Sequence, residues 1–187
     1  MSPVWRASSH EVEVAAGLLV EFRDHLGHSS PSNDSFVASV QRLIGQPDTE
    51  FWLASVEPGT AAAAICQLRF RHSVWTAADD CWLEDLFVRP EARRRGLARA
   101  LVARALQRGC ERGCRRVELD TNEDNRAAIS LYESLGFSAT SKGPSRSLFL
   151  GARLDHPAGD PARDDQEASS RGITRPTSTA APSRVSA

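Results

Sequence analysis

The apolar residues in the middle of the chain change their spacing repeatedly, and this alternation limits the possible folds more than any other feature. Residues 82–88 form a short apolar run that Pro90 stops, and the apolar residues after position 97 recur at helical spacing. Residues 116–121 again have the pattern of a strand, and residues 125–135 that of a helix. A strand–helix–strand–helix order predicts an α/β or α+β fold.

The same patterns extend the predicted domain to both sides of this central region. Ser8 and Glu11 fit a capping box at a helix start, and a Pro58-Gly59 turn separates two apolar runs that form a hairpin. We expect further strands at residues 4–7, 51–56, 61–70, 137–140 and 147–154, and helices at residues 8–26 and 33–44.

The composition changes sharply at residue 155. From there to residue 187, 20 of 33 residues are Pro, Ala, Gly, Ser or Thr, and none is aromatic. Such a segment cannot bury enough apolar surface to offset the entropy lost on folding. We therefore expect a folded domain at residues 1–154 and a disordered tail at residues 155–187.

The net charge of −1, from 23 basic and 24 acidic residues, gives no overall attraction to nucleic acid or to an anionic membrane. The chain lacks an apolar run of membrane-spanning length and begins without a signal peptide, which favours a cytoplasmic protein. Its four cysteines have neither a CxxC spacing nor paired histidines, so no metal site is expected.

An arginine-rich loop joins the strand at residues 82–88 to the next helix. It reads Arg93-Arg94-Arg95-Gly96 and leads directly into the helix. A helix start offers unpaired N–H groups and the positive end of the dipole, and glycine allows a phosphate to approach the backbone. The loop lacks the Gly-Lys-Ser/Thr ending of a Walker loop and the full GxGxxG pattern of a dinucleotide-binding fold, which argues against ATP and NAD. A different ligand that contains a pyrophosphate is therefore expected.

At this loop the sequence resembles the GNAT superfamily of N-acetyltransferases. The family's acetyl-CoA signature, Arg/Gln-x-x-Gly-x-Gly/Ala, matches residues 93–98 after a strand at the usual distance. A second family pattern, Asn-x-x-Ala-x-x-x-Tyr-x-x-x-Gly-Phe, matches residues 125–137. The resemblance implies a mixed, mostly antiparallel central sheet flanked by helices, with two parallel strands splayed apart at the cofactor cleft.

The resemblance also implies acetyl-CoA as the cofactor and assigns residues to it. Ten arginines and only two acids lie between residues 89 and 116, which suits three phosphate groups, although Arg104, Arg108 and Arg112 are interpreted as a solvated helix face. The residues expected to bind the cofactor are Leu86, Phe87, Val88, Arg93, Arg94, Arg95, Gly96, Leu97, Ala98, Arg99 and Asn125. Asn125 could equally be only the N-cap of its helix.

Glu84 and Tyr132 are the predicted catalytic residues. An alkylammonium must lose a proton before it attacks a thioester, and the resembling family often uses a carboxylate at the position of Glu84, directly or through water. Tyr132, the only tyrosine, falls on the family's acid position and could protonate the departing thiolate. The alternatives are an arginine partner for Glu84 and a core role for Tyr132.

The acceptor is expected to be a small-molecule amine. Asp79, Asp80 and the acids of the catalytic strand lie near two tryptophans, and this mixture attracts organic cations, although Asp79 and Asp80 could simply form a hydrophilic loop. The residues assigned to substrate binding are Trp75, Trp82 and Asp85, with Asp85 on the opposite strand face from Glu84 unless a bulge intervenes.

The sequence thus predicts an N-acetyltransferase that moves an acetyl group from acetyl-CoA to a primary amine by direct transfer in a ternary complex. Two alternatives remain open, a non-catalytic acyl-CoA-binding regulatory module and a protein or peptide N-acetyltransferase. By analogy with the family, a homodimer is possible.

Overall fold

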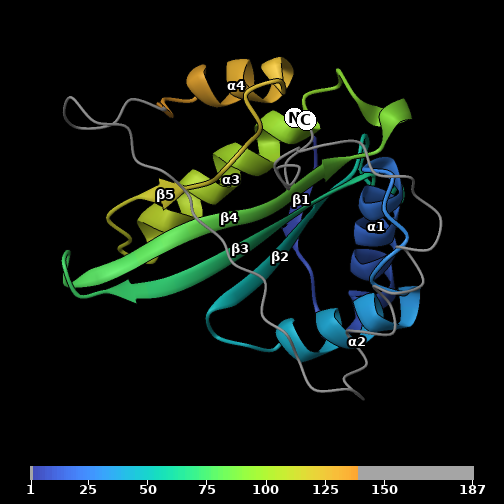
Figure 1. Ribbon diagram of the computed structural model, residues 1–187, viewed down its shortest axis with the longest axis horizontal. Helices are drawn as coiled ribbons and strands as arrows, with labels where there is room; N and C mark the ends of the chain where they lie inside the picture. The colour runs from blue at the N-terminus through green and yellow to red at the C-terminus, as the bar shows by residue number, and fades with distance from the viewer. Residues whose placement is uncertain (1, 139–187) are drawn as a thin grey trace, which may run out of the picture.

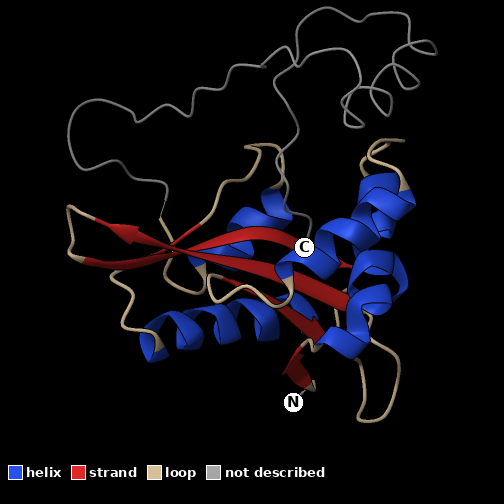
Figure 2. Ribbon diagram, turned by 90° about the horizontal axis from the view of Figure 1, so that it is seen from below, coloured by secondary structure: helices blue, strands red, loops and turns tan. Residues whose placement is uncertain are grey.

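A five-stranded sheet in the order β1-β2-β3-β4-β5 runs through the molecule, with helices on both of its faces (Figures 1 and 2). The computed structural model describes residues 2–138. Strands β1 to β4 pair antiparallel in sequence order, and β5 pairs parallel with β4. The predicted mixed, mostly antiparallel sheet flanked by helices is confirmed.

The elements occur close to their predicted positions. The strands are β1 (Val4–Arg6), β2 (Thr49–Ala54), β3 (Ala64–Ser73), β4 (Ala78–Val88) and β5 (Val117–Glu118). The helices are α1 (Val12–His25), α2 (Asn33–Leu43), α3 (Leu97–Glu111) and α4 (Arg126–Glu133), with short 3₁₀ turns η1 (Ser9–Glu11) and η2 (Pro90–Ala92).

The C-terminal elements can be compared only in part. Phe137 and Ser138 are not in a strand, and the rest of the expected strand at 137–140 lies outside the described residues. The expected strand at 147–154 and the tail at 155–187 also lie outside them.

Strand β5 is shorter than the predicted strand at residues 116–121. Only two pairs join it to β4, Cys81 with Val117 and Trp82 with Glu118. Beyond Trp82, β4 continues to Val88 without further pairing to β5. The two parallel strands therefore diverge, and the short β5 is the direct result of this divergence.

Two hydrophobic cores sandwich the sheet, one on each face. The core under α1 and α2 includes Phe51, Leu53 and Ile65. The core under α3 includes the residues next to them in sequence, such as Trp52 and Cys66, whose side chains point to the other face. Strands β2 and β3 thus bury both of their faces, and all six residues of β2 are buried. This two-sided burial fixes the pairing register, because a shift by one residue would exchange the two cores.

Candidate active site

A β-bulge interrupts strand β4 at the predicted catalytic carboxylate. On one side of it Leu68 of β3 pairs with Leu83, and on the other side Gln67 pairs with Asp85. Glu84 is therefore the extra residue of the bulge and lies between these two pairs in β4. A bulge of this kind bends the strand and redirects side chains, and it often occurs next to active sites.

The bulge brings the two acidic side chains to the same face of the sheet. The Nε2 atom of Gln67 donates a hydrogen bond to Glu84 Oε2 at 3.1 Å. Asp85 pairs with Gln67 and lines a cavity together with it. Regular alternation predicted opposite faces for Glu84 and Asp85, and the bulge is the intervening feature that prevents this.

The cavity lies between α2 and the sheet and has a volume of about 110 Å³. Its walls are mostly apolar and include Phe36, Val40 and Phe51. Gln67 and Asp85 supply polar groups from the sheet. Gln67 was not predicted from the sequence, although a glutamine inside the apolar run at residues 61–70 was a usable signal.

Two residues of the loop before α3 have a positive φ. Gly96, the N-cap of the helix, has φ +83°, and Arg94 has φ +62°. Glycine adopts such a φ without strain, and helix-start N–H groups next to it can bind an anion. Arg94 and Arg95 are exposed beside these N–H groups.

Two other arginines of this region make contacts within the protein. Arg93 donates from Nε to the carbonyl oxygen of Val88 at 3.1 Å, and its terminal nitrogen donates to His25 Nε2 at 3.0 Å. Arg99 donates to the hydroxyl of Ser134 at 2.7 Å and so links α3 to α4. These contacts hold the loop against the end of β4 and the start of α3 against α4.

The remaining predicted cofactor residues lie in or beside the two cores. Leu86, Val88 and Leu97 belong to the core between the sheet and α3, and Phe87 belongs to the core under α1 and α2. Ala98 is partly buried. Only the backbone groups of the buried residues could reach a ligand, as the resemblance implied for Leu86 and Val88.

Asn125 is the N-cap of α4. Its side-chain oxygen accepts a hydrogen bond from the N–H of Ala128 at 3.2 Å. The N-cap alternative from the sequence is thereby confirmed. A contact with cofactor from the same side chain stays a prediction.

Tyr132 lies in the core on the α3 side of the sheet, with 3% of its surface exposed. Its ring contacts Phe137 edge-on, with the ring centroids 5.6 Å apart. Burial raises the pKa of the phenol, and so do Cys66 of β3 and Asp120 beyond β5. The phenol therefore lies near the region where β4 and β5 diverge, and it stays protonated at neutral pH.

Two buried hydroxyls at this divergence are unsatisfied. The oxygens of Tyr132 and Thr121 have no hydrogen-bond partner among the residues that the structure describes. Buried polar groups are nearly always hydrogen-bonded, so such atoms mark places where a ligand could bind. Thr121 was not predicted, because nothing in the sequence distinguishes it from the other threonines.

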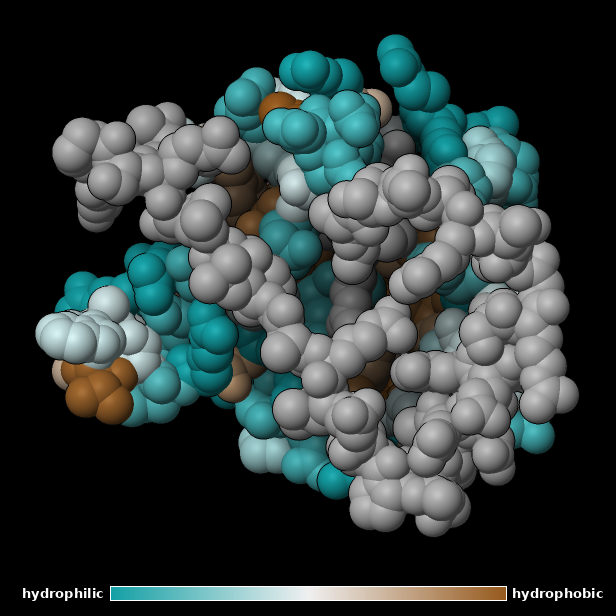
Figure 3. Space-filling model, in the orientation of Figure 1, coloured by the Kyte–Doolittle hydropathy of each residue, from teal (hydrophilic) through white to brown (hydrophobic). Residues whose placement is uncertain are grey.

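The predicted substrate residues are separated in space. Trp75 is 98% exposed in the turn between β3 and β4, and in Figure 3 this projecting end carries a small hydrophobic spot. The six residue-to-residue steps from Ala78 to Glu84 alone span roughly 20 Å at strand geometry, so Trp75 is far from the bulge. Trp82 is nearer, two residues before Glu84, and the Arg71 guanidinium lies 5.5 Å from its ring centroid.

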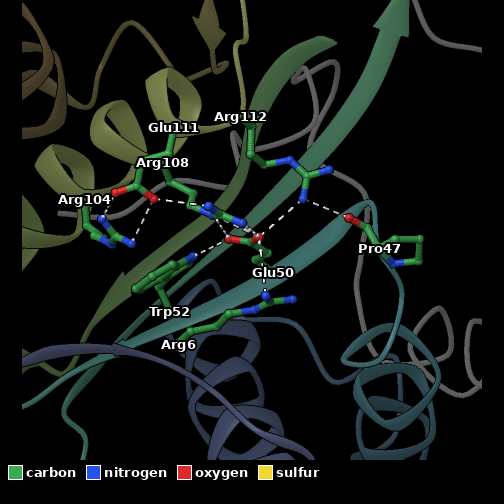
Figure 4. Close-up of polar contacts among 8 residues, drawn as sticks. All are labelled: Arg6, Pro47, Glu50, Trp52, Arg104, Arg108, Glu111 and Arg112. Atoms are coloured by element: carbon green, nitrogen blue, oxygen red, sulfur yellow. Dashed lines mark hydrogen bonds and ion pairs between the residues drawn. The ribbon is translucent and has the colours of Figure 1, made fainter.

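The interpretation of Arg104, Arg108 and Arg112 as a solvated face is wrong. The guanidinium of Arg104 lies 4.2 Å from the ring centroid of Trp52, and that of Arg112 lies 4.0 Å from that of Phe70. All three arginines face strands β2 and β3 rather than solvent alone (Figure 4). Stacking on aromatic rings and a buried partner carboxylate outweigh hydration here.

Glu50 of β2, whose side chain is fully buried, is the partner of Arg108 and Arg112, whereas Arg104 pairs with Glu111 at 2.8 Å. Both oxygens of Glu50 accept hydrogen bonds from Arg108 at 2.8 to 3.1 Å, and Oε2 also accepts from Trp52 Nε1 at 3.0 Å. Arg112 contacts Oε1 at 3.4 Å, and Arg6 lies 3.6 Å from it. Burial raises the pKa of Glu50, but these hydrogen bonds and charges lower it below its ordinary value.

Two further features of the described region bear on function. Among residues 2–138, no three His, Cys, Asp or Glu side chains come together as a metal site. None of the helices in this range is both long enough and apolar enough to cross a membrane.

Solved structures of acetyltransferases share this fold. A probable acetyltransferase is 24% identical, with 81% of this chain and 99% of that chain covered and a TM-score of 0.71. A candidate acetyltransferase from Arthrobacter sp. FB24 is 26% identical, covers 82% and 97%, and has a TM-score of 0.73. The aminoglycoside N-acetyltransferase AAC(6')-Iy in complex with CoA is 21% identical, covers 82% and 96%, and has a TM-score of 0.66. No curated protein matches the chain.

The fold is thus one that acetyltransferases share. Residues 19–137 match the acetyltransferase (GNAT) family, and this range contains the bulge, the arginine loop and Tyr132. The chain belongs to the GNAT family of acetyltransferases.

Proposed function

We propose that this protein transfers the acetyl group of acetyl-CoA to a primary amine of a small molecule, by direct attack in a ternary complex. The observation that carries the proposal is the buried hydroxyl of Tyr132, which has no hydrogen-bond partner within residues 2–138 and belongs to the core on the α3 side of the sheet. Carboxylates at the β4 bulge and an anion-binding helix start complete the set of groups that the reaction requires.

The residues at the start of α3 fit the phosphates of acetyl-CoA. The positive φ of Gly96, the first-turn N–H groups of α3 and the exposed Arg94 and Arg95 form a positively charged site for a pyrophosphate. The diverging strands leave backbone groups of β4 beyond Trp82 unpaired with β5, and these suit the amides of an extended arm. When bound, acetyl-CoA supplies an activated acetyl group as a thioester.

Glu84 is the proposed general base. An alkylammonium has a pKa near 10.4, so a carboxylate that binds it must also help to remove a proton before the nitrogen can attack. The hydrogen bond from Gln67 orients the Glu84 carboxylate. Asp85, on the same face, adds negative charge that favours binding of the cation.

Tyr132 is the proposed general acid. Its raised pKa keeps the phenol protonated at rest, so the hydroxyl is available to donate a hydrogen bond, and then its proton, to the departing thiolate. In the reaction a C–N bond forms and the C–S bond breaks. Before the attack the ammonium loses one proton to the carboxylate, directly or through water, and the carboxylate later releases it to solvent. The phenol proton goes to the departing sulfur, and the second proton that the nitrogen loses on forming the amide returns to the phenolate.

The test is thiol release from acetyl-CoA over a panel of alkylamines, polyamines, aminoglycosides and peptides. The proposal predicts release with at least one free amine. Tight binding of coenzyme A without release for any acceptor would instead favour a regulatory acyl-CoA-binding module. Acetylation restricted to peptide N-termini or lysines would favour a protein-modifying enzyme.

A further inference from the structure

We infer that the preferred acceptor is a primary amine carrying a short aliphatic group, which occupies the cavity between α2 and the sheet. This inference rests on the proposed function and defines its substrate class. It distinguishes this chain from the aminoglycoside acetyltransferases that share its fold, whose substrates are polyhydroxylated.

The first argument is the chemistry of the cavity wall. Side chains from α1, α2 and β2 present carbon to its interior, among them Leu19, Phe36, Val40, Leu43 and Phe51. Val40 and Phe51 are each only 1% exposed, so the wall is part of the rigid core rather than a mobile surface. An aliphatic group fits the apolar part of this wall, whereas a sugar hydroxyl placed against the same side chains would lose its hydration without a partner among them.

The second argument is the position of the polar groups. Asp85 and Gln67 come from adjacent strands and form the sheet side of the cavity. Gln67 also donates to Glu84, so the cavity adjoins the proposed base through a single side chain. An ammonium group held at these carboxylates would direct its hydrocarbon portion toward α2.

The third argument is size. The cavity of about 110 Å³ is somewhat smaller than the apolar cavity of about 150 Å³ that is known to hold benzene. A chain of about three to five carbons therefore fills it. Each methylene buried in such a site should raise the specificity constant roughly fourfold, which is the fold-change equivalent of its transfer free energy.

The experiment measures kcat/KM for straight-chain primary amines from ethylamine to octylamine, with acetyl-CoA saturating. These amines have nearly the same pKa, so their protonation does not distort the series. We expect kcat/KM to rise roughly fourfold per methylene up to about five carbons and then to level off or fall. A flat series, with efficient acetylation of an aminoglycoside or polyamine, would overturn the inference and leave acetyl transfer intact.

Two variants on α2 link the preference to this cavity. Ser39 is exposed and lines the cavity, so Ser39→Phe should occupy part of it and lower kcat/KM for butylamine by about tenfold or more, with little change for ethylamine. Ala38 is exposed on the same helix but does not line the cavity, so Ala38→Phe is the matched control and should leave both substrates unchanged. Equal effects of the two variants would show that the aliphatic group binds elsewhere.

The outcomes separate the two proposals. No turnover with any amine would refute the proposed function itself. Turnover that is insensitive to chain length and to Ser39→Phe would refute only the substrate class.

Discussion

Two buried polar regions lie on the α3 side of the same sheet, and they differ in how completely they are hydrogen-bonded. Around Glu50 the buried carboxylate receives donors from Trp52, Arg108 and Arg112 (Figure 4). Near the divergence of β4 and β5, the hydroxyls of Tyr132 and Thr121 have no partner within residues 2–138. The first region is satisfied by the protein alone, and the second has hydrogen-bonding capacity left for a ligand.

This difference indicates what each region contributes. A fully bonded buried carboxylate holds α3 to β2, and loss of any member leaves charges unpaired. An unsatisfied hydroxyl adds nothing to folding and can even destabilise the folded state. Substitutions near Glu50 should therefore reduce stability, and substitutions near Tyr132 should reduce turnover.

The largest expected effect is that of Tyr132→Phe on turnover. Without the phenol proton, kcat should fall about 10³-fold, equivalent to about 4 kcal/mol of transition-state stabilisation. The affinity for acetyl-CoA and the thermal midpoint should change little, because the ring stays in place. Steady-state kinetics, calorimetric titration with coenzyme A and thermal unfolding measure the three quantities.

Thr121→Val is the matched variant for this test, since it removes the other unsatisfied hydroxyl and keeps the shape. A fall in turnover equal to that of Tyr132→Phe would mean that the two hydroxyls act together. A loss of stability in Tyr132→Phe without loss of turnover would reverse the comparison between the two regions.

The next effect in size is that of Glu50→Ala on folding. Arg6, Arg108 and Arg112 would lose their buried counter-charge. The free energy of unfolding should fall by about 3 kcal/mol, the lower end for buried pairs because these arginines are partly exposed. Chemical denaturation measures this change, and kcat per folded molecule should be retained. The control is Glu111→Gln, which changes a more exposed partner of Arg108 and should lower the free energy of unfolding by less.

Gly96→Ala should have a smaller effect, and it should change both the stability of the helix start and the binding of acetyl-CoA. At φ +83° an alanine is strained by about 1 to 2 kcal/mol, although its Cβ meets no other atom within 4 Å. The helix start should then shift, and KM for acetyl-CoA should rise while kcat stays similar. Gly17→Ala inside α1, which also meets no neighbour, should raise stability slightly without altering KM, and an equal rise in KM there would contradict the assignment.

The smallest effect concerns acid stability. Because the pKa of Glu50 is lowered in the folded state, its stabilising contribution is complete above its ordinary pKa of 4.5 and is lost as pH falls through the folded value. Below pH 4.5 the unfolding free energy of the parent protein should therefore fall more steeply than that of Glu50→Gln. Denaturation curves between pH 3 and 7 would test this, and parallel curves would contradict it.

Most of the fold could be predicted from the sequence because its elements have clear local signals. The Ser8–Glu11 capping pair is present, with the Ser8 N–H donating to the Glu11 carboxylate at 2.9 Å, and the helices and most strands begin within a few residues of the expected positions. The length of β5 could not be predicted, because it depends on where β4 turns away and not on the residues of β5 themselves.

The site was harder to predict, because its geometry arises between strands. Period-two alternation places Asp85 opposite Glu84, and only the pairing with Gln67 reveals the bulge. Trp75 is close to the acids in sequence, but the hairpin carries it to the far end of the strand. Arg104, Arg108 and Arg112 have the spacing of a solvated face, and Glu50, the partner of the last two, is 58 residues from Arg108 along the chain.

The bulge at Glu84 also bears on how such a site could arise. Before it, Cys81 and Leu83 face the α3 core, and after it Leu86 and Val88 face the same core. A chain lacking residue 84 would keep this alternation, with Asp85 in the place of Glu84 and both cores unchanged. One extra residue in β4 is therefore enough to add a second carboxylate to this face without any rearrangement of the interior.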